Sequence, residues 1–162
     1  MPKVLKDNSV IEDIWQILDE SANTLPGGDV LVPFDQWESI SEQLANYDGR
    51  VGVIIEGNAE VEEIIEPLLN LPLIAINFPK FADGRAFSSA RLLRDRYQYS
   101  GEIRAVGGFM RDQLFLLQRC GFNAFKFNDD IDLTEASKSL QDFSETYQVG
   151  VDQNNPLFRR RS

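Results

Sequence analysis

The chain has 162 residues, of which 43% are hydrophobic and 26% are charged. This composition is typical of a globular protein with one core, and it excludes a disordered or collagen-like chain. There is one cysteine, Cys120, and no histidine. These counts exclude a disulfide framework, a cysteine-ligated iron–sulfur cluster, a His/Cys zinc site and a Ser–His or Cys–His nucleophile pair. We expect no metal and no cofactor.

Charge is unevenly distributed along the chain, whose formal net charge is −10. Residues 80–126 contain nine basic and four acidic side chains, a net +5, which leaves −15 for the rest. This segment indicates either a basic face for an anionic ligand or an acidic partner, or solvated helices with local pairs such as Arg91 and Asp95. The negative total argues against a nucleic-acid partner.

The sequence shows no membrane or export signal. No run approaches the roughly 18 apolar residues of a membrane span, and residues 1–13 are too polar for a secretion signal. We therefore expect a cytoplasmic protein without a membrane partner, in which a lone thiol is ordinary. We expect one domain over residues 1–153 and a loose tail over residues 154–162.

The predicted elements alternate between helix and strand. An opening helix around residues 10–18 is predicted to cover a sheet edge. Short continuous apolar runs predict strands at residues 29–33, 51–56, 73–77, 103–106 and 124–127. Apolar residues at helical spacing predict one helix after Asp35 and another after Asn58, and Pro67 should kink or shorten the second. The same spacing predicts helices at residues 86–97, 114–117 and 136–147, and Asp132 could cap the last of these.

This alternation predicts an α/β fold: a mainly parallel five-stranded sheet with helices on both faces. A complete eight-stranded barrel needs about 200 residues or more, so a partial β/α barrel is the alternative. In such folds ligands collect at the carboxyl ends of the strands.

Two predicted strand ends carry candidate anion-binding groups. After the turn at Asp83-Gly84, Arg85 stands at a helix N-terminus beside Ser88, where it could hold a carboxylate, sulfate or phosphate. Alternatively, Asp83 caps the helix and Arg85 pairs with a nearby acid.

Gly107-Gly108 lies between a strand and a helix. The two glycines either let the backbone approach a bound anion closely or make a tight turn. They lack the spacing of a dinucleotide-binding fingerprint. Arg111 opens the next helix and is expected near Arg85. Glu56, which closes an apolar strand, and Asp83 are the candidates for acid–base catalysis. We expect Cys120 to be a small buried hydrophobe.

The stretch from Leu73 to Phe127 resembles a bacterial family of uncharacterised proteins, domain of unknown function 934. The resemblance lies in residues 81–88 (FADGRAFS), 91–94 (RLLR), 101–107 (GEIRAVG), 111–114 (RDQL) and 119–122 (RCGF). Members are commonly labelled oxidoreductases of sulfite reduction, because their genes tend to accompany those for assimilatory sulfite reductase. The family supplies no established catalytic residues.

The resemblance and the charge pattern together suggest an accessory protein of assimilatory sulfate/sulfite reduction. With no histidine and one cysteine, the chain cannot ligate siroheme or an iron–sulfur cluster in the usual way. It would instead dock to sulfite reductase or its electron donor, or bind a sulfur oxyanion, through the basic segment. The alternatives are a small enzyme acting on an anionic metabolite at the strand ends, and a flavin-binding oxidoreductase without a recognisable motif.

Overall fold

The computed structural model describes residues 3–18, 25, 27–78, 85–109, 111–127, 132–138 and 140. Within them the strands are β1 Lys3–Lys6, β2 Ser9–Glu12, β3 Gln16–Ile17, β4 Val30–Pro33, β5 Val51–Glu56, β6 Leu73–Phe78, β7 Glu102–Gly107 and β8 Ala124–Phe127. The helices are η1 Phe34–Gln36, α1 Trp37–Leu44, α2 Val61–Ile64, η2 Glu66–Leu68, α3 Arg85–Asp95, η3 Arg111–Gln113 and α4 Leu114–Cys120, and residues 133–138 are also helical.

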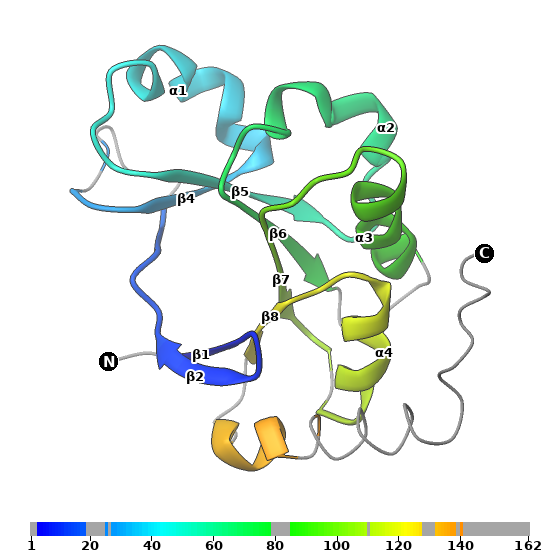
Figure 1. The fold of residues 1–162 in the computed structure, drawn as a ribbon. Helices are drawn as coiled ribbons and strands as arrows, with labels where there is room; N and C mark the ends of the chain where they lie inside the picture. The colour runs from blue at the N-terminus through cyan, green and yellow to red at the C-terminus, as the bar shows by residue number, and fades with distance from the viewer. Residues whose placement is uncertain are drawn as a thin grey trace.

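The eight strands form one curled sheet, in the order β2-β1-β8-β7-β6-β5-β4-β3. From β3 to β8 the strands are parallel, and each pairs with the next one in the chain. Figure 1 shows α1 to α4 outside the curve of this sheet, so the molecule has the form of a half barrel. The predicted alternative, a partial β/α barrel, therefore fits.

The prediction of five strands with helices on both faces was wrong, and the strand order explains why. Crossover connections between parallel strands are right-handed. The face of the sheet that a crossover helix covers is therefore set by whether the next strand is placed to the left or to the right of the previous one. Here every new parallel strand is added in the same direction, so the crossover helices all cover the convex face. A doubly wound sheet would require the order to reverse.

The main core lies between the convex face and these helices. Ile74, Ile76 and Phe78 of β6 are at most 2% exposed, and they belong to one buried cluster with residues of α3 such as Ala90 and Leu93. Because successive side chains of a strand point to opposite faces, the intervening residues of the same strands face the concave side.

The predicted opening helix was also wrong, because residues 3–12 form a hairpin of β1 and β2. Asp7 and Asn8 at its turn both have positive φ, 50° and 67°. Two such residues match the right-handed twist of the paired strands, and Asp and Asn tolerate this conformation. β1 then pairs antiparallel with β8, so the hairpin extends the sheet beyond its parallel part.

Several other predictions are confirmed. Each of the five predicted strands is present within one residue of its expected ends. The helix before Pro67 is shortened, because α2 ends at Ile64 and Pro67 lies in the short helix η2. Asp132 caps the helix at residue 133, since its Oδ1 accepts hydrogen bonds from the backbone N–H groups of Thr134 and Glu135.

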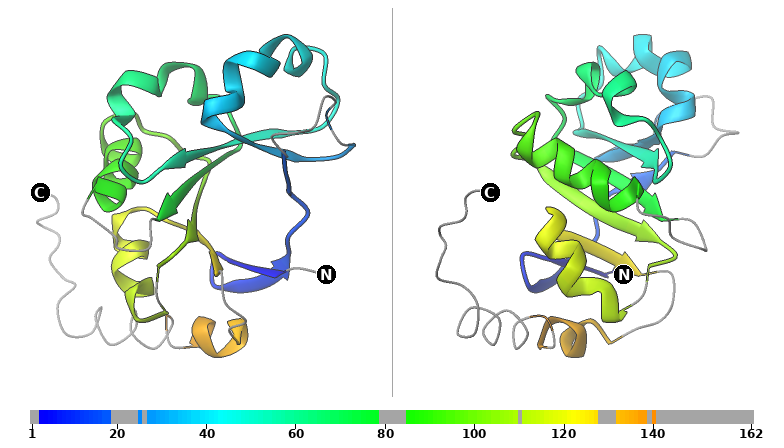
Figure 2. Two further views of the ribbon diagram at one scale, coloured as in Figure 1. Left: turned by 180° about the vertical axis from the view of Figure 1, so that it is seen from behind. Right: turned by 90° about the vertical axis from the view of Figure 1, so that its right-hand side faces the viewer.

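Residues 13–15, which we call the strap, connect the two ends of the curled sheet. They run from β2 at one end to β3 at the other, on the concave side (Figure 2). Trp15 is 9% exposed and packs with Leu31, Leu73 and Ala75 in a small core separate from the main one. The strap therefore covers part of the concave face, which the crossover helices leave open. Within the described residues, no helix is long and apolar enough to cross a membrane.

Candidate functional site

The carboxyl ends of the parallel strands bring several predicted residues to one edge. Glu56 is the last residue of β5 and is exposed, and its Oε1 accepts a hydrogen bond of 3.1 Å from Asn77 Nδ2 on the neighbouring β6. Sequence reasoning missed Asn77, although a polar residue at the end of an apolar strand is the same signal that selected Glu56.

A pocket of about 290 Å³ opens beside Glu56. It is lined by Pro33, Phe34, Asp35, Ile54, Ile55, Glu56, Ala59 and Ile64. The lining is apolar apart from two carboxylates, so an anion could enter it only with a cation from a neighbouring loop.

Arg85 begins α3 at the same edge, as predicted. Its Nη1 lies 3.8 Å from Glu60 Oε1 and donates a hydrogen bond of 3.3 Å to the carbonyl of Asn58. This matches the alternative in which Arg85 pairs with a nearby acid, here Glu60. Ser88 follows one turn later and is exposed, whereas Asp83 lies outside the described residues.

Gly107 is the last residue of β7 at this edge and has a positive φ of 96°, and Gly108 follows it. A Cβ at Gly107 would lie 2.4 Å from Asn77 Oδ1 and 2.6 Å from the carbonyl of Phe78. The N–H of Gly108 donates to that carbonyl at 3.0 Å. The glycine pair therefore makes a close backbone turn against the end of β6.

Arg111 begins η3 after β7, so it follows the strand next to the one that precedes Arg85. The topology thus brings both residues to the same edge. The structure describes the backbone of Arg111 but not its side chain. Cys120 is 7% exposed, which confirms that it is a buried side chain.

The structure distributes the basic residues of segment 80–126 among three places. Arg94 points inward, and its guanidinium donates to the carbonyls of Tyr99, Gly101 and Gly121 at 2.8–2.9 Å. Burial lowers the pKa of Arg94, against the opposing influence of nearby Tyr99 and Asp7. Arg104 and Lys126 lie on the concave face, and Arg85, Arg91, Arg96 and Arg119 are exposed on or beside α3 and α4. Lys80 lies outside the described residues.

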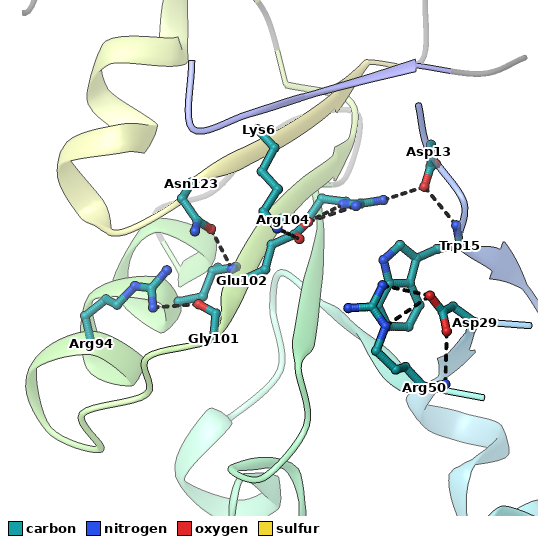
Figure 3. Close-up of polar contacts among 11 residues, drawn as sticks. Lys6, Asp13, Trp15, Asp29, Arg50, Arg94, Gly101, Glu102, Arg104 and Asn123 are labelled. Carbon is teal, nitrogen blue, oxygen red and sulfur yellow. Dashed lines mark hydrogen bonds and ion pairs between the residues drawn. The ribbon is translucent and has the colours of Figure 1, made fainter. Parts of the chain in front are cut away.

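The concave face carries a charged group that sequence reasoning did not assemble. We call it the concave cluster: Lys6, Asp13, Glu102, Arg104 and Lys126. Figure 3 shows Arg104 reaching from β7 to Asp13 of the strap, with Glu102 beside it. Arg104 Nη1 lies 3.0 Å from Asp13 Oδ1, and Arg104 Nη2 lies 2.8 Å from Glu102 Oε2.

The remaining two cations complete the concave cluster from β1 and β8. Lys6 Nζ lies 3.2 Å from Glu102 Oε1, and Lys126 Nζ pairs with Asp13 Oδ2. Burial alone would raise the pKa of Asp13, but the hydrogen bond from Lys126 and the charge of Arg104 outweigh it and hold that pKa below 3.8. Asp13 is therefore a charged carboxylate near neutral pH.

A second ion pair lies near the other end of the strap (Figure 3). Asp29 accepts hydrogen bonds of 2.7 and 3.0 Å from the Arg50 guanidinium, which holds the pKa of Asp29 below its usual value. The Arg50 guanidinium also lies 5.0 Å from the centre of the Trp15 ring. The strap is thus fixed at both ends by charged contacts. Among the described residues no three His, Cys, Asp or Glu side chains form a group that could hold a metal ion.

These features define an α/β half-barrel protein with a candidate edge site and a charged concave face. The chain belongs to the bacterial protein family of unknown function DUF934, which matches residues 52–158. That description assigns no reaction, and no curated protein and no solved structure matches the chain. The match begins within β5, so it leaves out the strap and the N-terminal hairpin.

Proposed function

We propose that this protein is a cytoplasmic accessory component of assimilatory sulfite reduction, and that it docks to an acidic redox partner through the outer surface of α3 and α4. The sulfite-reduction context comes from the label that members of the family commonly carry. The docking surface comes from the charges and apolar groups of these two helices.

The charge of the two helices supports an acidic partner. Residues 85–96 and 111–120 contain six arginines and two acids, and without the inward-pointing Arg94 their net charge is +3, whereas the whole chain has a net charge of −10. A local patch of opposite sign to the rest of a protein orients an incoming acidic partner and raises the association rate.

The observation that carries the proposal is the exposed Leu116, which is 52% exposed on α4. On the same helix Arg119 is exposed, and its guanidinium lies 5.9 Å from the centre of the Phe115 ring. α3 packs beside α4 (Figure 1) and adds the exposed Arg91. An apolar side chain next to arginines and an aromatic ring is the composition found at the centre of protein interfaces.

The test is binding of the full chain to purified sulfite reductase and, separately, to its electron donor, by calorimetry at two ionic strengths. We expect Arg91→Glu, Arg119→Glu and Leu116→Ser each to weaken binding about tenfold or more, and we expect salt to weaken binding by the wild type. Lys3→Glu is the matched control, because it makes the same change in net charge at an exposed residue of β1.

If neither protein binds the wild type, or if Lys3→Glu weakens binding as much as the α3 and α4 variants, the proposal is wrong. Arg85→Ala and Arg111→Ala extend the test to the carboxyl edge. If only these two variants lose affinity, the contact surface is the edge rather than the outer helix surface.

The pocket beside Glu56 favours a second candidate, a small enzyme acting on an anionic metabolite. Glu56, held by Asn77, would move the proton, and Arg85 with Arg111 would bind the anionic group. A thermal-shift screen of phosphorylated, sulfated and carboxylated metabolites tests this candidate. Stabilisation that Glu56→Gln leaves intact and Arg85→Ala removes would support it, and the absence of any stabilising metabolite would contradict it.

A further inference from the structure

The concave cluster carries an excess of positive charge in an acidic protein. Lys6, Arg104 and Lys126 face two carboxylates, so one positive charge is left without a counterpart inside the cluster. The side chains of Asp13 and Arg104 are only 1% and 2% exposed. Arg104 is paired with both carboxylates, so the surplus positive charge lies on the two partly exposed lysines and attracts negative charge from solvent to this side of the cluster.

The two lysines give the cluster contact with solvent. The side chains of Lys126 and Lys6 are 31% and 37% exposed, and each also touches a nearly buried carboxylate. They approach from β8 and β1, on one side of Arg104. An anion arriving from solvent would therefore meet these ammonium groups before it reached the guanidinium.

Asp13 already shows how this site holds an oxyanion. Its Oδ1 accepts hydrogen bonds from Arg104 Nη1 at 3.0 Å and from the Trp15 backbone N–H at 3.2 Å, and its Oδ2 accepts one from Lys126 Nζ. A guanidinium and an ammonium group converging on two oxygens are the donors that bind carboxylate, sulfate and phosphate. Both cations belong to the sheet, whereas Asp13 belongs to the strap, which has no regular secondary structure.

We propose that the concave cluster is a binding site for a small oxyanion, held by Lys126 and Arg104 with Lys6 nearby, and that the Asp13 carboxylate fills this site from within the chain. An external anion then binds in exchange for Asp13, and the strap moves away from the sheet. Trp15 is two residues from Asp13 and packs on Leu73 and Ala75, so its fluorescence reports this movement. The proposal is independent of the docking surface on α3 and α4.

The test is rescue of Asp13→Ala in the full chain. Its melting temperature and Trp fluorescence are followed while acetate, sulfate or phosphate is added at constant ionic strength. We expect saturable stabilisation, with a half-saturating concentration at least about tenfold lower than for the wild type, because the internal competitor has been removed. Rescue by acetate alone identifies a carboxylate site, and rescue by sulfate or phosphate identifies a site for tetrahedral oxyanions.

Two comparisons make the result specific. Asp29→Ala removes the partner of the exposed Arg50 near the other end of the strap, and we expect no saturable rescue for it. Adding Lys126→Met to Asp13→Ala should abolish rescue. The proposal fails if Asp13→Ala responds no more than Asp29→Ala, or if the double variant still responds.

If Asp13→Ala does not fold, calorimetry of the wild type with the same three anions tests whether the concave cluster binds an oxyanion. Binding that is lost in Lys126→Met supports the site. Failure of all three anions to bind, or equal binding by Lys126→Met, overturns it.

Discussion

Replacing Arg104 by methionine tests the central position of this residue in the concave cluster. The variant leaves the carboxylates of Asp13 and Glu102, whose side chains are 1% and 8% exposed, without their shared guanidinium. Removing one member of a buried ion pair costs about 3–5 kcal/mol. Lys126 and Lys6 still contact the two carboxylates, so we expect the lower end of this range, about 3 kcal/mol.

Urea unfolding followed by Trp fluorescence measures this loss. With a denaturant dependence of about 2 kcal/mol per molar urea, the midpoint should fall by about 1.5 M. Arg91→Met is the control, because Arg91 is exposed, and it should change the free energy of unfolding by less than about 0.5 kcal/mol. A loss below about 1 kcal/mol for Arg104→Met would refute the assigned role of the buried guanidinium.

Three further predictions follow from local geometry. Gly107→Ala should cost about 1–3 kcal/mol of stability, because the added Cβ would lie 2.4 Å from Asn77 Oδ1 at a residue with positive φ; urea unfolding should show almost no change for Gly27→Ala, where nothing lies within 4 Å. The pKa of Asp13 is held below its ordinary 3.8, so its carboxylate stabilises the fold above about pH 3.8 and this contribution is lost as the pH falls through the folded-state pKa. The stability difference between the wild type and Asp13→Asn should accordingly be constant near neutral pH and shrink in acid; a constant difference down to pH 3 would contradict this. Arg94→Met should cost about 3 kcal/mol, since it removes the donor of three backbone carbonyls, and an unchanged melting temperature would count against it.

Five of the six parallel strands, β4 to β8, could be predicted because they are continuous and largely apolar runs, whereas the two exposed residues of β3 gave no such signal. The N-terminal hairpin could not be predicted in the same way. The four residues of β2 are all exposed, so they lack the alternation of a half-buried strand. Val10 and Ile14 also have the spacing of a helix stripe, and the Asp7-Asn8 turn was the remaining signal.

The sequence contained a sign that helices cover only one face of the sheet, but our prediction did not use it. In β7, Glu102, Arg104 and Val106 occupy alternate positions, and an ion pair two residues apart in a strand lies on one face. A face that carries Arg104 is not one that an apolar helix covers. This pattern could have indicated that one face of the sheet lacks helices.

The candidate sites were predicted only where they depend on local sequence. Glu56, Arg85 and Gly107 were selected because each lies at a strand or helix end, and the structure places them at the carboxyl edge. The partners of Arg104 and Lys126 could not be predicted in this way, because Asp13 is separated from these cations by 91 and 113 residues. Contacts over such distances depend on the strand order, which one sequence does not reveal.

The pairing of β1 with β8 also bears on how the protein is made. The ribosome synthesises β1, at residues 3–6, well before β8, which begins at residue 124, so the hairpin of β1 and β2 emerges long before its neighbour in the sheet exists. Until then its apolar residues Val4 and Leu5, fully buried in the finished fold, have no surface to pack against. Such exposed strands attract chaperones and neighbouring nascent chains, and assembly is completed only when the last strand of the sheet joins the first.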